Sequence, residues 1–105
     1  MYLTNPLLIL EPPIILQAPR NITANANSTV LIDCQVRGEP WPSVTWYKGG
    51  KIVGNGCPLI IQSVDADHSG VYKCLVHNSL GQSTAAEARL TVNCKILHMH
   101  FETTT

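Results

Sequence analysis

The chain has 105 residues, a formal net charge of zero at neutral pH and only 13% charged residues. A chain of this length suffices for one domain and leaves little for a second. Because it carries neither a basic stripe nor an acidic run, we expect no nucleic-acid partner and no solvating tail. Its seven prolines and seven glycines indicate the many turns of an all-β protein.

The predicted elements are short strands separated by turns. Residues 1–11 are interpreted as a linker or loosely held N-terminal segment, and residues 94–105 as a C-terminal tail. The stretch 30–36 alternates apolar and polar residues, which at period two predicts a strand with one buried face. Gly49-Gly50 is a two-residue hairpin signal. In chain order, strands are predicted at 14–16, 21–23, 30–36, 44–47, 51–53, 59–64, 71–76 and 86–92, with a loop at 37–42 and a polar corner at 65–70.

The cysteines and sequons point to the secretory route. The chain has four cysteines and no C-x-x-C pair, so zinc-ribbon and thioredoxin-like sites have no support. N-x-[ST] glycosylation sequons begin at Asn21 and Asn27, and their closeness favours an extracellular protein. No signal peptide is recognised, because no Lys or Arg precedes the apolar residues 7–10, and no stretch is long enough to span a membrane. We therefore expect an excerpt from a longer secreted or membrane-anchored protein, without direct membrane insertion.

An ordered set of residues carries a resemblance to a known family. Cys34 is followed by Trp46 and then by Cys74, and Tyr72 stands two residues before that second cysteine. Over residues 12–93 the chain resembles the I-set of the immunoglobulin superfamily. The shorter motifs that complete the resemblance are Gly38-x-Pro40-x-Pro42-x-Val44-x-Trp46, Leu59-x-Ile61-x-x-Val64, Ser69-Gly70-x-Tyr72-x-Cys74 and Asn78-x-x-Gly81.

The resemblance implies an all-β, Greek-key immunoglobulin-like β-sandwich without cofactors. It also implies that a disulfide between Cys34 and Cys74 joins the two sheets and that Trp46 packs against it. The hydroxyl of Tyr72 is then expected to donate a hydrogen bond to a carbonyl at the polar corner.

Two departures from the family pattern concern the family's strand D. His68 stands where I-set domains usually have Asp, and the segment between Trp46 and Leu59 is shorter than usual. We therefore expect strand D to be short or absent, which leaves the strand at 59–64 more exposed than in other members.

Several residues are candidates for contact with a partner. Trp41, between two prolines, is either a rigid aromatic anchor or a ring folded onto its own loop. Tyr47 and Leu75 are expected on the outer face of the sandwich. This face binds a partner, self-associates or is simply exposed to solvent. The implied topology puts Cys57 and Cys94 at opposite ends of the domain, so each is expected to be free or to pair with another domain or chain.

No catalytic or metal site is expected. His68 and Ser69 are neighbours in sequence, but no nucleophile elbow, metalloprotease motif or phosphate-binding loop is present. Cys94, His98 and His100 lack a nearby fourth ligand for structural zinc. The sequence therefore predicts a non-catalytic extracellular protein–protein recognition module of an adhesion, matrix or receptor protein. The alternative is a cytosolic structural spacer, as in muscle-type arrays of such domains, with its cysteines reduced.

Overall fold

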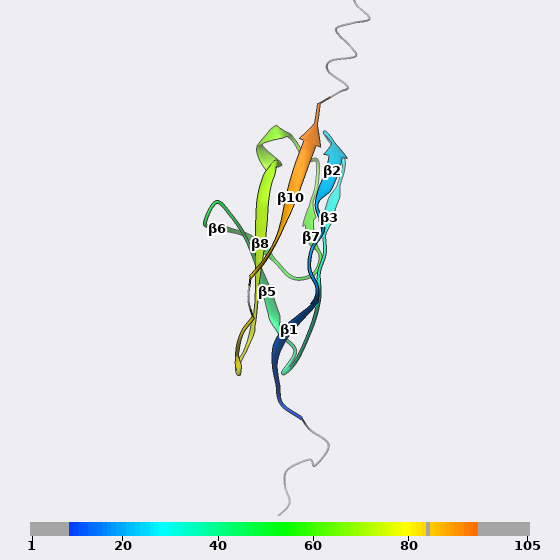
Figure 1. Ribbon diagram of the computed structural model, residues 1–105. Helices are drawn as coiled ribbons and strands as arrows, with labels where there is room; N and C mark the ends of the chain where they lie inside the picture. Colours follow the sequence, from blue (N-terminus) through cyan, green and yellow to red (C-terminus); the bar gives the residue numbers. More distant parts are fainter. Residues whose placement is uncertain (1–8, 84, 95–105) are drawn as a thin grey trace, which may run out of the picture.

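The computed structural model describes residues 9–83 and 85–94, which fold into two facing β-sheet layers (Figure 1). The larger sheet has the strand order β2–β10–β8–β5–β6, with β9 also paired to β8. In the second layer, β1 pairs with β4 and β3 pairs with β7. The predicted β-sandwich is therefore confirmed. The strands are β1 Glu11–Gln17, β2 Ile22–Asn25, β3 Val30–Ile32, β4 Gln35–Glu39, β5 Ser43–Lys48, β6 Lys51–Asn55, β7 Leu59–Ile61, β8 Gly70–Asn78, β9 Gly81–Gln82 and β10 Ala86–Asn93.

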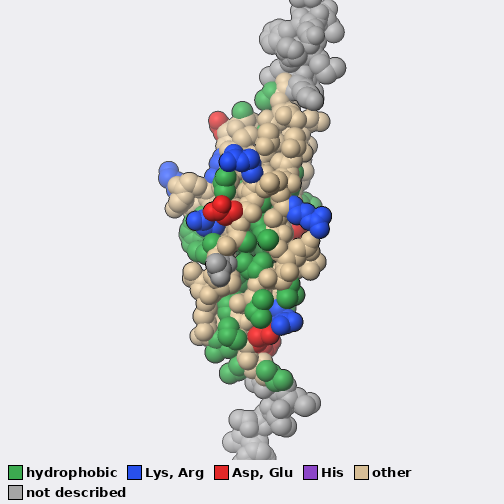
Figure 2. Space-filling model, viewed as in Figure 1, with side chains coloured by type: hydrophobic (Ala, Val, Ile, Leu, Met, Phe, Trp, Pro, Cys, Tyr) green, Lys and Arg blue, Asp and Glu red, His purple; other side chains and the backbone are tan. Residues whose placement is uncertain are grey.

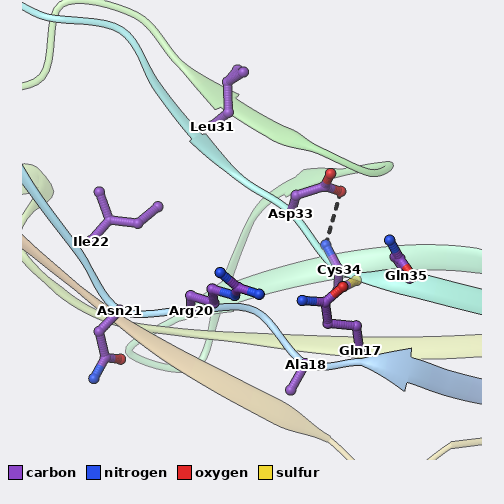
Figure 3. Close-up of a pocket in the computed structure, with 9 residues that line it drawn as sticks. All are labelled: Gln17, Ala18, Arg20, Asn21, Ile22, Leu31, Asp33, Cys34 and Gln35. Carbon is purple, nitrogen blue, oxygen red and sulfur yellow. Dashed lines mark hydrogen bonds between the residues drawn. The ribbon is translucent and has the colours of Figure 1, made fainter.

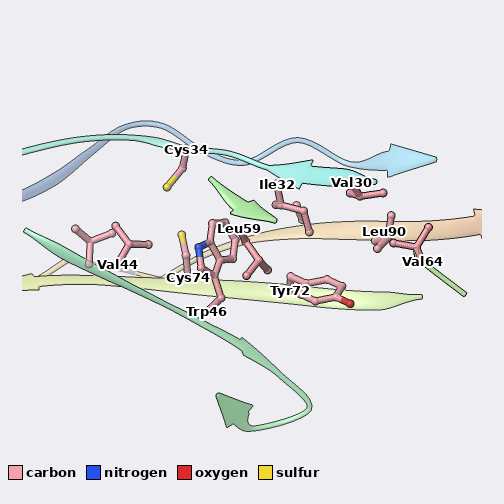
Figure 4. Packing of buried hydrophobic residues seen from close by; sticks show 12 residues of the cluster. Val30, Ile32, Cys34, Val44, Trp46, Leu59, Val64, Tyr72, Cys74 and Leu90 are labelled. Atoms are coloured by element: carbon pink, nitrogen blue, oxygen red, sulfur yellow. The ribbon is translucent and has the colours of Figure 1, made fainter. Parts of the chain in front are cut away.

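The core takes alternate residues from strands of both layers (Figure 4). Trp46 on β5 is completely buried, as the family resemblance implies for this position. Every predicted inward residue on β5 and β8 is buried, because side chains of a strand alternate between its two faces. The residues of this buried hydrophobic cluster are Val30, Ile32, Cys34, Val44, Trp46, Leu59, Val64, Tyr72, Cys74, Val76, Ala88 and Leu90.

The polar corner before β8 is held by side-chain hydrogen bonds. A short 3-10 helix, η1 (Ala66–His68), occupies it, and the hydroxyl of Tyr72 donates to the His68 carbonyl as predicted. The backbone N–H of Asp65 donates to Nδ1 of His68 over 2.9 Å, and Asp65 Oδ1 accepts from the N–H of Asp67. His68 therefore helps to cap this turn.

The single strand predicted at 30–36 is wrong, because the structure divides it into β3 and β4. At the break, Oδ1 of Asp33 accepts the backbone N–H of Cys34 over 2.8 Å, which takes that donor away from the sheet. The loop predicted at 37–42 is partly wrong too, since β4 extends to Glu39. Pairing with β1 explains this extension, and Arg37 Nη2 lies 3.0 Å from the carboxylate of Glu11 across that pair.

The strand predicted at 59–64 also ends early, at Ile61. Ser63 has a φ of 52°, a left-handed conformation that breaks a strand. The chain then returns to the core at Val64, which is buried and whose N–H donates to the Ser28 carbonyl over 3.0 Å.

The family's strand D is absent, as predicted. Residues 56–58 lead directly from β6 into β7, and the N–H of Gly56 donates to the Val44 carbonyl over 2.8 Å. Among the described residues, β3 is the strand that pairs with β7, and no strand covers its other edge. The structure therefore has one open sheet edge beside this short connection.

Candidate functional site

The outer face of β5, β6 and β8 presents an apolar surface that faces away from the core. Tyr47 pairs with Ile52 on one side and with Lys73 on the other, so these three side chains form a row across the sheet. Val71 and Leu75 lie on β8 two residues before and after Lys73, and therefore point to the same side. We call these five residues, Tyr47, Ile52, Val71, Lys73 and Leu75, the Tyr47 face.

The Tyr47 face is hollowed beside the β5–β6 turn. A cavity of about 370 Å³ is lined by four of its residues together with Gly49 and Gly50. These glycines have φ values of 59° and 80°, the left-handed conformations that a two-residue hairpin turn requires. Because glycine has no side chain, the residues of this turn leave the hollow uncovered.

Charge on this side of the molecule is balanced. The ammonium of Lys73 lies 3.7 Å from the carboxylate of Glu87 on the neighbouring strand β10. On the side of the molecule seen in Figure 2, basic and acidic side chains are interspersed, with hydrophobic side chains between them. Such a surface suits a protein partner, because interfaces combine an apolar centre with a polar rim.

Of the candidate contact residues, Tyr47 and Leu75 lie together on this face, whereas Trp41 lies at one end of the sandwich. Trp41 is 71% exposed, so its ring is not folded down onto its own loop. Sequence reasoning missed Ile52, which is 66% exposed. The Gly-Gly turn was the available signal, because a two-residue turn places Ile52 opposite Tyr47.

The loop that carries Trp41 is held by the amide of Asn78. Nδ2 of Asn78 donates to the carbonyls of Pro40 and Glu11, each over 2.9 Å. Its Oδ1 accepts the N–H of Leu80 over 2.8 Å. One side chain therefore joins the start of β1, the Trp41 loop and the β8–β9 turn.

The two core cysteines face each other between the sheets. Both Cys34 and Cys74 are buried thiols in this structure, and their sulfurs point toward one another in Figure 4. A hydrogen bond to Cys74, together with burial and Cys57, raises the pKa of Cys34 far above its usual range. The same hydrogen bond lowers the pKa of Cys74. The implied disulfide between them stays a prediction.

The remaining cysteines lie in different surroundings, and both are exposed. The sulfur of Cys57 lies 3.2 Å from the sulfur of Cys34, a proximity that sequence reasoning missed. Cys94 follows the end of β10. The other members of the considered metal cluster, His98 and His100, lie outside the described residues.

A second, more polar hollow of about 330 Å³ lies beside the break between β3 and β4 (Figure 3). Its lining side chains spread around it rather than pointing to a common centre. Within residues 9–83 and 85–94, no group of three His, Cys, Asp or Glu side chains is arranged so that it could hold a metal ion. In the same part of the chain, no helix is long and apolar enough to cross a membrane. The lining residues are Gln17, Ala18, Arg20, Asn21, Ile22, Leu31, Asp33, Cys34 and Gln35.

Comparison with known proteins gives the family. The immunoglobulin domain model matches residues 12–78, and the chain belongs to this family of β-sandwich domains. It is 35% identical over 81 residues to the smooth-muscle myosin light chain kinase of Gallus gallus, which covers 67% of this chain and 4% of that protein. It is 33% identical over 97 residues to the "Cell adhesion molecule-related/down-regulated by oncogenes" protein of Xenopus laevis, which covers 84% of this chain and 8% of that protein.

Among solved structures, the chain resembles one from the titin M10–obscurin-like 1 Ig complex. The TM-score is 0.73 at 29% identity, over 79% of this chain and 95% of that one. The curated relatives named above are far longer, and this chain matches one small part of each. The family is thus found in kinases as a module, in adhesion-related proteins and in complexes between proteins.

Proposed function

We propose that this domain is a non-catalytic recognition module that binds another folded protein through the Tyr47 face. The observation that carries the proposal is the row of Ile52, Tyr47 and Lys73 beside an uncovered hollow. Tyrosine buries a large, stiff side chain at little entropic cost, and aromatic residues dominate the binding energy of protein interfaces. The paired charges of Lys73 and Glu87 then belong to the polar rim.

The similar structures support a folded protein as the partner. One of them is a complex of titin M10 with an immunoglobulin domain of obscurin-like 1. Likeness of fold alone does not carry a partner from one protein to another. The proposal therefore rests on the Tyr47 face, and the complex shows only that such a domain takes part in protein binding.

Two matched substitutions test which surface binds. Ile52 is 66% exposed on β6, and Ile60 is 56% exposed on β7 in the opposite layer. The whole chain is screened against cell-surface and matrix proteins, and also against itself. We expect Ile52→Ser to weaken binding by about tenfold or more, the loss typical of a central apolar contact, while Ile60→Ser leaves it unchanged. Equal effects of the two substitutions, or none from either, would overturn the proposal.

We also propose that the domain works outside the cell. Asn21 and Asn27, which begin the two sequons, are both exposed. Oδ1 of Asn21 accepts the N–H of Arg89 over 2.8 Å, and a glycan would attach to the other amide atom, Nδ2. In protein from its native source we expect glycan that Thr23→Ala removes at Asn21 and Thr29→Ala removes at Asn27.

The second candidate is a cytosolic spacer module. Its support is the similarity to smooth-muscle myosin light chain kinase and to titin domains. The two candidates differ in their cysteines, because disulfides persist mainly outside the cytosol. The spacer would be favoured over the extracellular module by two observations on native protein. All four thiols would react with an alkylating reagent after denaturation, and no glycan would be present.

A further inference from the structure

The sulfur of Cys34 has two other cysteines beside it, the buried Cys74 and the exposed Cys57. Cys34 lies between them, with its sulfur 3.2 Å from that of Cys57 and pointing toward that of Cys74 (Figure 4). The family resemblance gives Cys34 one disulfide partner, whereas the structure offers it two. Cys57 reaches this place because the short connection without a strand D carries it directly from β6 to β7.

The three thiols differ sharply in their access to solvent. Cys34 is 5% exposed and Cys74 is 0% exposed, whereas Cys57 is exposed. An oxidant in solution therefore meets Cys57 first. The rate of thiol–disulfide exchange depends on this access as well as on the thiolate content of the attacking group.

We propose that Cys57 is an oxidation site that accepts low-molecular-weight disulfides such as oxidised glutathione and passes the bond to Cys34. The thiolate of Cys57 attacks the small disulfide, which forms a mixed disulfide and releases one small thiol. Cys34 then attacks the Cys57 sulfur and passes its own proton to the departing small thiolate, so that a Cys34–Cys57 bond forms and the second small thiol leaves. The two cysteines lose two electrons and two protons, which the reduced small thiols take up.

The same geometry applies when Cys34 is already bonded to Cys74. Attack of the Cys57 thiolate on the Cys34 sulfur then forms the Cys34–Cys57 bond and breaks the bond to Cys74. The Cys74 sulfur leaves as a thiolate and takes up the proton that Cys57 gave up, so the exchange needs no oxidant. The disulfide then no longer joins the two sheets through Cys74. It joins the β3–β4 break to the β6–β7 connection instead.

Trypsin distinguishes the possible products, because its cleavage sites separate the cysteines. Arg20, Arg37, Lys51, Lys73 and Arg89 place Cys34 in the peptide 21–37, Cys57 in 52–73 and Cys74 in 74–89. The whole chain carrying Cys94→Ser, reduced and folded, is treated with oxidised glutathione. Acid quenching, alkylation and mass spectrometry of the peptides then report the pairing.

We expect the linked peptides 21–37 and 52–73 as the main product. We also expect Cys57→Ser to slow oxidation of the folded protein by about tenfold or more, because the accessible thiol is lost. Cys74→Ala should still form the Cys34–Cys57 bond. Any one of three results would overturn the proposal. The first is a main product that links peptides 21–37 and 74–89, and the second is a glutathione adduct on Cys57 that never passes to Cys34. The third is an unchanged rate of oxidation in Cys57→Ser.

Discussion

The indole N–H of Trp46 donates a hydrogen bond to the carbonyl of Gly56, with the two atoms 2.7 Å apart. Trp46 is completely buried, and a buried indole nitrogen needs such an acceptor. The acceptor comes from the connection that stands in place of strand D. The core tryptophan therefore anchors the segment that carries Cys57 and leads into the open-edged strand β7.

Replacement of Trp46 by Phe tests this anchor. The substitution leaves a cavity and deprives the Gly56 carbonyl of its partner, so we expect a loss of about 2 kcal/mol in the free energy of unfolding. Urea denaturation measures it. The matched control is Trp41→Phe at the exposed position, where we expect stability to stay within about 0.5 kcal/mol of the original. Equal stability of the two variants would contradict the anchoring role.

Gly54 on β6 is required for close packing. A Cβ at this position would lie 2.5 Å from Cδ1 of Leu59, which is buried. We expect Gly54→Ala to destabilise the domain by about 1 to 3 kcal/mol, the usual effect of overpacking. In a Leu59→Val background the clashing atom is gone, and the further effect of Gly54→Ala should be smaller. Strictly additive effects in this double-mutant cycle would refute the clash.

Tyr72 makes stability depend on alkaline pH. Burial raises the pKa of Tyr72 above its ordinary value of 10.0, so the folded state keeps the phenolic proton up to a higher pH than the unfolded chain does. This contribution to stability is present in full below pH 10.0 and is lost as the pH rises through the folded-state pKa. We expect the stability of the native sequence to fall more steeply above pH 10.0 than that of Tyr72→Phe. Parallel curves in denaturation experiments across this range would argue against it.

Asn78 holds the Trp41 loop in place. Removal of its amide with Asn78→Ala leaves the carbonyls of Glu11 and Pro40 and the N–H of Leu80 without this partner. We expect a loss of about 1 to 3 kcal/mol in stability and faster amide exchange at Glu39 and Trp41 and over residues 79–81. Asn55→Ala, at an exposed position on β6, serves as the control and should change neither. Unchanged exchange in Asn78→Ala would show that other contacts hold the loop.

The strands on either side of the core follow from local patterns. Alternation in β5 and β8 requires only that side chains on a strand point to opposite faces, and the Gly49-Gly50 turn requires only two residues that accept positive φ. The interruption at Asp33 was not predicted, because apolar alternation continues through Cys34 while a side-chain hydrogen bond breaks the ladder. The outward positions of Tyr47 and Leu75 followed from the same alternation. That Tyr47 and Leu75 lie beside Ile52 and Val71 depended on strand register.

By itself, the sequence determined a β-sandwich, since periodicity and turn residues are short-range properties. Its resemblance to the I-set, together with the length of one connection, implied an immunoglobulin-type sandwich with strand D short or absent. The tertiary structure alone decided which distant residues meet. Asn78 reaches Glu11 across 67 positions, and Cys57 reaches Cys34 across 23. Such contacts depend on how the two sheets pack and on where the short connection enters β7, and no local preference of the residues themselves encodes that geometry.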